Sequence, residues 1–126
     1  MVGSGGWLNL LHLGRVEYLR NLGLFMEGAP RTPVQVVVRR SAVEHLAPAR
    51  FDDALIIRVR CARLGSSSAT FEYLVDNGDE LRLLLAETVV ICVEMATFRS
   101  SNWPLVFRER VAEYEEENLQ IGQSLR

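Results

Sequence analysis

The chain has 126 residues, the size of one domain. Hydrophobic residues make up 48% of it and charged residues 24%, which excludes a disordered chain. The net charge is −2 and arginine supplies all of the positive charge, so no global field favours nucleic acid or anionic lipid. No apolar run reaches the roughly 18 residues of a membrane span, and no secretory signal precedes the first element. We therefore expect one cytoplasmic domain over residues 1–126, with neither nucleic acid nor membrane as a partner.

The first predicted element is a long helix over residues 7–23, and the rest of the chain is organised around it. Arg15 and Arg20 are expected to fall outside its apolar stripe, and Gly23 is a typical helix end. A stripe this wide needs a large covering surface, most simply a sheet. At helical spacing, the stripe contains Trp7, Leu8, Leu11, Val16, Tyr18, Leu19 and Leu22.

Four strands are predicted after this helix. Residues 34–43 form a β-branched run, and residues 54–64 and 69–76 alternate between apolar and polar side chains. Residues 80–95 form one long β-branched run. A serine-rich turn and an Asn-Gly pair separate the last three runs, so we expect hairpins and a largely antiparallel sheet.

Loops and a second helix complete the predicted order. Glycine and proline place a loop at residues 25–33, and Pro48 indicates a break over residues 44–53. Residues 105–119 have the spacing of a short amphipathic helix, and its acidic run at 115–117 is expected to face solvent. The pattern predicts an α+β fold in which the long helix lies across an antiparallel sheet.

Three residue types bear on possible reactive or metal sites. Cys61 and Cys92 lie inside strand-like runs, so we expect small buried thiols in a reducing compartment. His12 and His45 are the only histidines, and no metal-ligand spacing occurs, so no metal or other cofactor is expected. Glu87 interrupts the most apolar run, and a buried carboxylate there needs an arginine or an oligomer neighbour.

Three phrases of the sequence can be compared with known families. Residues 15–20 read Arg-Val-Glu-Tyr-Leu-Arg and are followed by Leu-Gly-Leu at 22–24. Residues 48–53 read Pro-Ala-Arg-Phe-Asp-Asp, and residues 64–68 read Leu-Gly-Ser-Ser-Ser. In their order and spacing, these phrases resemble the hotdog-fold acyl-CoA thioesterase family that includes 4-hydroxybenzoyl-CoA thioesterase. The resemblance implies a long central helix wrapped by a curved antiparallel β-sheet, with a short C-terminal helix.

The resemblance also implies an activity. Members of this family hydrolyse a thioester between an acyl group and coenzyme A or an acyl carrier protein, as homodimers or homotetramers joined at sheet edges. The family phrase that carries the catalytic aspartate would align before Met1, together with the first strand, so we expect both to be missing and activity to be impaired. The alternative is a hotdog protein that binds acyl-CoA without turnover or serves as a purely structural oligomer. A hydratase is a more distant alternative because its acid–histidine signature is not present.

Three residues are candidates for catalysis. Backbone N–H groups at the helix start near Ser4, which is flanked by glycines, could stabilise the developing oxyanion. A second branch of hotdog thioesterases carries its catalytic carboxylate on the central helix. That resemblance makes Glu17, the one acid on this helix, a candidate general base or nucleophile, with His12 five residues before it. The competing interpretations are a mobile chain end for Ser4, an ordinary hydrogen-bonding carboxylate for Glu17 and a packing histidine for His12.

Substrate-binding candidates come from the strands and the serine turn. In the family, the hairpin that matches Ser66, Ser67 and Ser68 borders the pantetheine channel. Coenzyme A carries several phosphate charges, so arginines are expected near the channel mouth. The arginine candidates are Arg58, Arg60 and Arg63, or alternatively Arg39 and Arg40. For each arginine alone, ordinary solvated surface is the competing interpretation.

Overall fold

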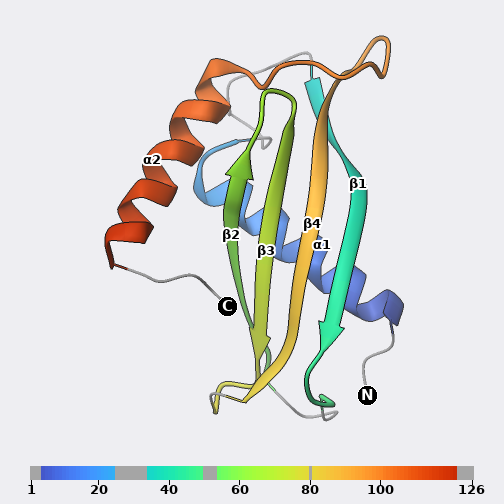
Figure 1. Ribbon diagram of the computed structural model, residues 1–126, viewed down its shortest axis with the longest axis vertical. Helices are drawn as coiled ribbons and strands as arrows, with labels where there is room; N and C mark the ends of the chain where they lie inside the picture. Colours follow the sequence, from blue (N-terminus) through green and yellow to red (C-terminus); the bar gives the residue numbers. More distant parts are fainter. Residues whose placement is uncertain (1–3, 25–33, 50–53, 80, 122–126) are drawn as a thin grey trace.

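The computed structural model describes residues 4–24, 34–49, 54–79 and 81–121. All six predicted elements are present in the predicted order (Figure 1). They are α1 (Ser4–Asn21), β1 (Val34–His45), β2 (Ile56–Leu64), β3 (Ser68–Asp76), β4 (Arg82–Glu94) and α2 (Leu105–Ile121). The predicted loop at 25–33 and residues 50–53 lie outside the described residues. The predicted break at residue 44 comes too early, because β1 continues to His45 and pairs it with Leu84.

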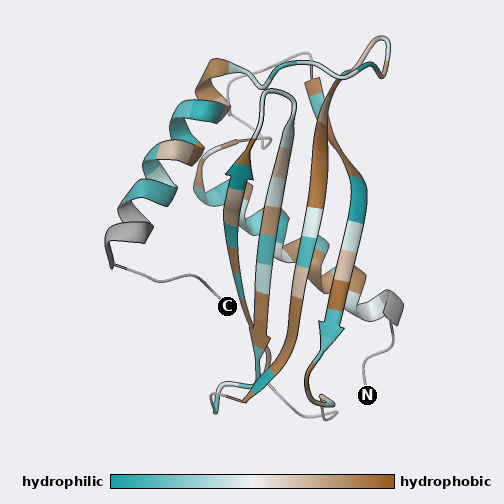
Figure 2. Cartoon of the chain, in the orientation of Figure 1, coloured by the Kyte–Doolittle hydropathy of each residue, from teal (hydrophilic) through white to brown (hydrophobic). Residues whose placement is uncertain are grey.

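The four strands form one sheet in the order β1-β4-β3-β2, and every neighbouring pair is antiparallel. β4 lies inside the sheet and is predominantly hydrophobic along its length (Figure 2). β1 and β2 are the two edge strands, and each carries a register shift, at Val38/Arg40 and at Cys61/Arg63 respectively. α1 crosses one face of the sheet, and α2 lies beside β2 (Figure 1). No helix among the described residues is long and apolar enough to cross a membrane.

The buried face of α1 differs from the predicted stripe at two residues, Arg15 and Leu8. Arg15 is only 7% exposed and lies on the sheet side of the helix, so the prediction that it falls outside the stripe is wrong. Residue 15 follows Leu11 by four positions and precedes Tyr18 by three, which places all three on one helix face. Leu8, which was assigned to the stripe, is instead exposed.

α1 lies close to the sheet at Gly14. A Cβ atom added there would lie 3.1 Å from Val59 Cγ2 and 3.2 Å from Ile57 Cγ2. The absence of a side chain at this one position therefore lets the helix pack directly on β2. The close contact also fixes which flank of the helix faces the edge of the sheet.

Two smaller predictions from the sequence are confirmed. Cys61 and Cys92 are buried free thiols rather than a disulfide. Glu87 accepts a hydrogen bond from Arg40 on β1, with 3.4 Å between Nη2 and Oε1. The carboxylate within the apolar strand therefore meets an arginine, as its surroundings require.

Candidate active site

A groove of about 560 Å³ opens between α1 and β2, within the range of small-molecule sites. Its helix side contains Leu10, Gly14, Glu17 and Asn21, which follow one another at steps of three or four residues and so share one flank of α1. Its strand side is built by Ile57 and Val59, together with Leu55 and Arg58. An apolar floor with a carboxylate at its rim is suited to an acyl chain whose reactive end meets an acid–base group.

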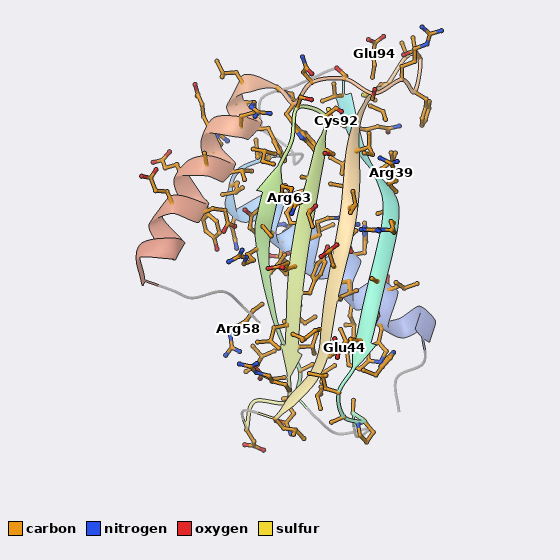
Figure 3. The ribbon with its side chains drawn as sticks, viewed as in Figure 1. Arg39, Glu44, Arg58, Arg63, Cys92 and Glu94 are labelled. Atoms are coloured by element: carbon orange, nitrogen blue, oxygen red, sulfur yellow. The ribbon has the colours of Figure 1, made fainter. Side chains whose placement is uncertain are left out.

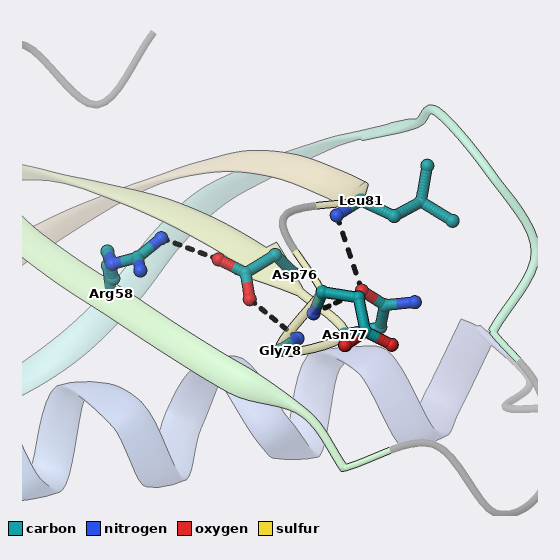
Figure 4. Close-up of polar contacts among 6 residues, drawn as sticks. Arg58, Asp76, Asn77, Gly78 and Leu81 are labelled. Carbon is teal, nitrogen blue, oxygen red and sulfur yellow. Dashed lines mark hydrogen bonds and ion pairs between the residues drawn. The ribbon is translucent and has the colours of Figure 1, made fainter.

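Glu17 and Arg58 are the two charged residues that line this groove. The Glu17 side chain is 62% exposed, and its Oε1 atom lies 3.5 Å from Arg20 Nε. Arg58 donates from Nη1 to the buried carboxylate of Asp76, which also accepts the backbone N–H of Gly78 at 2.9 Å (Figure 4). Both groups have an ion-pair partner, but the pair of Glu17 with Arg20 is long and exposed on both sides, so solvent and ligands can reach the Glu17 carboxylate.

A buried polar cluster adjoins the groove through Tyr18, which is also one of its lining residues. The Tyr18 hydroxyl donates to Glu115 Oε1 at 2.6 Å, and the backbone N–H of Cys61 donates to the same oxygen at 2.9 Å. Burial, and then the neighbouring Glu115, raises the pKa of the Tyr18 hydroxyl far above its usual range. The same two causes raise the pKa of the Cys61 thiol to about 12. Neither group is a nucleophile at neutral pH, so the cluster joins α1, β2 and α2 rather than performing chemistry.

The structure does not bring the three candidate catalytic residues together. His12 lies five residues before Glu17, which is about 140° around a helix, and its Nδ1 atom is 3.0 Å from Nη2 of Arg15. Ser4 is the first residue of α1, and its thirteen-residue separation from Glu17 corresponds to about 20 Å along the axis. Only Glu17 lines the groove, and the catalytic roles of all three residues stay predictions.

The predicted phosphate-binding arginines have different surroundings. Arg60 lies 3.1 Å from Glu72 across the β2–β3 pair, with both side chains mostly buried. Arg63 is exposed and makes no ion pair within the part of the chain that the structure describes. Figure 3 shows Arg58 and Arg63 toward opposite ends of β2, and Arg39 on the other edge strand.

The serine turn between β2 and β3 is held by backbone hydrogen bonds. The carbonyl of Ser66 accepts from the backbone N–H of Trp103 at 2.9 Å, and that of Ser67 accepts from Cys92 at 2.7 Å. The carbonyl of Ser68 accepts from the Trp103 indole at 2.9 Å. The turn lies at the end of β2 remote from Ile57, so these serines do not line the groove.

Comparison with known proteins decides the family. The sequence model of the thioesterase superfamily matches residues 5–83 of this chain. This chain belongs to the thioesterase superfamily. An Escherichia coli relative, the acyl-CoA thioester hydrolase YbgC, is 30% identical over 102 residues, which cover 81% of this chain and 74% of the relative.

Solved structures show the same fold at lower identity. DHNA-CoA thioesterase from Staphylococcus aureus has a TM-score of 0.82 at 13% identity, covering 96% of this chain and 83% of its own. The S. aureus protein SAV2348, solved in complex with CoA, has a TM-score of 0.86 at 10% identity, covering 98% and 76%. The predicted hotdog fold is thereby confirmed.

Two residues of this thioesterase-superfamily chain were missed by reasoning from the sequence. Arg15 was placed outside the helix stripe, and Glu115 was assigned to a solvated face. The structure corrects both, since Glu115 is half-buried and binds Tyr18 and Cys61. Spacing contained the signal for Glu115, because residue 115 follows the buried Val111 by four positions.

Proposed function

We propose that this chain hydrolyses the thioester of an acyl-CoA, or of an acyl carrier protein, with the acyl group in the groove between α1 and β2. The observation that supports this proposal most directly is the exposed carboxylate of Glu17 at the rim of an apolar groove in a thioesterase-superfamily chain. The acyl-CoA thioester hydrolase named above supports the substrate class. Acyl chains bury against Leu10, Ile57 and Val59, because removing apolar surface from water is favourable.

Glu17 acts in this proposal as the general base. Its carboxylate takes a proton from a water molecule, whose oxygen attacks the carbonyl carbon of the thioester. The carbon–sulfur bond then breaks, and the departing thiolate takes the proton from Glu17, which gives a free acid and a free thiol. Arg63 and Arg39 keep their predicted role in binding phosphate, since both are exposed and neither makes an ion pair within the described chain. Ser4, at the start of α1, and His12, in its middle, keep their predicted roles outside the groove.

We also propose that the protein forms a homodimer, the unit from which a homotetramer would be built, through the free edge of β1. Arg40, Ala42 and Glu44 lie on one face of this strand, since Ala42 pairs with Glu87 and Arg40 bonds to the same carboxylate. Antiparallel pairing of two β1 strands about Ala42 places Arg40 of each strand opposite Glu44 of the other. Opposite charges directly across a strand pair are favourable, so this edge is self-complementary. The reduced cysteines fit a cytoplasmic location.

A second candidate function is acyl-CoA binding without turnover. The observation that favours it is the position of His12, on the other flank of α1 from Glu17 and bonded to Arg15. Among the described residues that line the groove, Glu17 is therefore the one carboxylate, and no histidine lies beside it there.

The test combines hydrolysis and binding. Purified protein is incubated with aliphatic and aromatic acyl-CoA esters and a thiol reagent, beside the variant Glu17→Gln and the matched control Glu109→Gln from the exposed side of α2. We expect Glu17→Gln to lower kcat by about 100-fold or more and the control to have no effect. Equal rates for wild type and Glu17→Gln would refute the role of Glu17. Calorimetry with a non-hydrolysable analogue separates the two functions, because binding without any hydrolysis would establish the second.

A further inference from the structure

The groove between α1 and β2 continues into a second hollow of about 220 Å³, where α1 ends beside α2 (Figure 1). Asn21 and Tyr114 line both spaces, so they form the passage from one to the other. Leu22, Arg110 and Glu113 complete the lining of the hollow. The site is therefore longer than the groove alone, and it extends past the proposed general base toward α2.

α1 and β2 run in the same direction along the groove. Gly14 packs against Ile57, near the start of β2. One turn further along the helix, the Tyr18 hydroxyl shares Glu115 as its acceptor with the backbone N–H of Cys61, which lies further along the strand. The start of α1 therefore faces the start of β2, and the end of α1 faces α2.

The two directions away from Glu17 differ in polarity. Toward the start of α1 the lining is aliphatic, and the one charge on that side, Arg58, is already paired with the buried carboxylate of Asp76. The aliphatic lining residues are Leu10, Leu13, Leu55 and Ile57. Toward the end of α1 the lining offers an amide, a phenol and two opposite charges. An elongated substrate with one apolar and one polar end therefore fits the site in a single direction.

The hollow contains charges of both signs. Arg110 donates from Nη1 to the carbonyls of Leu22, at 2.9 Å, and Gly23, at 3.0 Å, so part of its charge is used by the carbonyl end of α1. Glu113 follows Arg110 by three residues on α2 and brings a negative charge to the same space. A phosphate would be repelled by this carboxylate, whereas an uncharged amide can hydrogen-bond to either group. The hollow therefore suits an uncharged polar ligand group.

Asn21 offers a matching hydrogen-bond partner at the entrance to this hollow. It is the last residue of α1, and its side chain is exposed and makes no hydrogen bond within the part of the chain that the structure describes. It follows Glu17 by four residues, which places it on the same helix flank and about 6 Å further along the axis. Its side-chain amide can donate to, and accept from, an amide of a ligand.

We propose that the substrate lies with its acyl tail toward Leu10 and its thiol carrier toward Asn21, which hydrogen-bonds to the first amide of the pantetheine arm. Coenzyme A and acyl carrier protein share this arm, and in it two methylene groups separate the sulfur from the first amide. With the thioester carbon beside Glu17, that amide falls within one helical turn, as Asn21 does. The rest of the arm enters the hollow beside Tyr114. The inference rests on the hydrolase function proposed above and adds to it an orientation and a specificity-determining residue.

Asn21→Leu removes the amide with little change in side-chain size, and Asn9→Leu, on the exposed side of the same helix, is the matched control. Both variants are assayed with one acyl group on three thiols. Coenzyme A has the whole arm, N-acetylcysteamine keeps the first amide without phosphate, and ethanethiol has neither. We expect Asn21→Leu to raise KM about three- to tenfold for the first two esters, the size of one hydrogen bond. Its kcat and the ethanethiol ester should be unaffected, and Asn9→Leu should change nothing.

Three results would overturn the assignment. An unchanged KM for the coenzyme A ester would show that Asn21 does not contact the substrate. Equal losses of kcat/KM for all three esters would show that the substitution acts on the fold. A loss that depends on acyl length and not on the amide of the thiol would show that the substrate lies in the opposite direction.

Calorimetry with a non-hydrolysable thioether analogue of acyl-CoA tests the contact without turnover. If wild type hydrolyses none of the esters, the hydrolase proposal fails, and the dissociation constant of the analogue still decides the position of the arm. A rise of about three- to tenfold in Asn21→Leu, with no change in Asn9→Leu, would support the contact. An equal constant for Asn21→Leu and wild type, or no binding to wild type, would overturn it.

Discussion

The guanidinium of Arg15 on α1 donates to the hydroxyl of Tyr73 on β3, 3.1 Å away, inside the core. Its second contact is with Nδ1 of His12, and no ion pair is seen for Arg15 within the described residues. A buried cation without a carboxylate partner is unfavourable. The helix is thereby tied to the sheet by a polar contact that lacks a counter-ion.

Supplying that counter-ion should stabilise the protein. His12→Glu places a carboxylate within one helical turn of the Arg15 guanidinium, and a hydrogen bond to a charged group contributes about 1.5–3 kcal/mol. We expect the Tm to rise by several degrees. His12→Gln keeps the hydrogen-bonding capacity without the charge and should give little or no rise. Equal Tm values for the two variants would show that the missing charge is not the cause.

Substitution of Glu115 on α2 should destabilise the fold. Glu115→Ala leaves the Tyr18 hydroxyl and the Cys61 N–H without their shared acceptor, and each unsatisfied buried group costs about 1–3 kcal/mol. We expect the free energy of unfolding, measured in urea, to fall by about 2–4 kcal/mol. The adjacent and exposed Glu116→Ala is the control and should change it by less than about 0.5 kcal/mol.

Alkaline pH should destabilise the fold. The Cys61 thiol has a pKa of about 12 in the folded chain against 9.0 for the free group, so between these values the unfolded state loses a proton that the folded state keeps. Stability is therefore fully present below about pH 9 and falls as pH rises toward 12. Tyr18, whose pKa is also raised, adds to the same trend at the alkaline end. Urea unfolding at several pH values should show a weaker dependence for Cys61→Ala, and an identical slope would contradict this account.

A methyl group at position 14 should disturb the contact between helix and sheet. Gly14→Ala improves helix propensity by about 1 kcal/mol, but the new Cβ would lie 3.1 Å from Val59 Cγ2. Overpacking of this kind typically costs about 1–3 kcal/mol, so we expect net destabilisation. Val59→Ala should cost less in the Gly14→Ala background than in wild type, because the shorter side chain makes room. Strictly additive effects would mean that the two positions do not compete for space.

Filling the groove should lower activity without lowering stability. Leu13→Trp adds bulk on the groove flank of α1, where residue 13 is already exposed. We expect kcat/KM to fall several-fold, with the longest acyl chains affected most and the Tm unchanged within about 2 °C. Asn9→Trp, on the exposed side of the same helix, is the matched control. Equal losses of kcat/KM in both variants would show that the acyl group does not bind in this groove.

Local pattern predicted the elements because periodicity is a property of neighbouring residues. The predicted helix over 7–23 is found at Ser4–Asn21, and the run over 80–95 is found as Arg82–Glu94. Alternation in β2 and the Asn-Gly hairpin predicted the antiparallel order. The motif phrases predicted the family, and the thioesterase-superfamily match over residues 5–83 confirms it.

The sequence by itself determined the order of the elements, the antiparallel sheet and the family, since each depends on short-range spacing or on phrases read directly. Only the tertiary structure decided that Arg15 is buried, that Glu115 joins three elements, and that the flank with Glu17 rather than the one with His12 lines the groove. The physical reason is that an amphipathic pattern fixes which residues share a helix face but not which flank meets an edge strand. Packing of Gly14 against Val59 makes that choice, and with it the position of the groove.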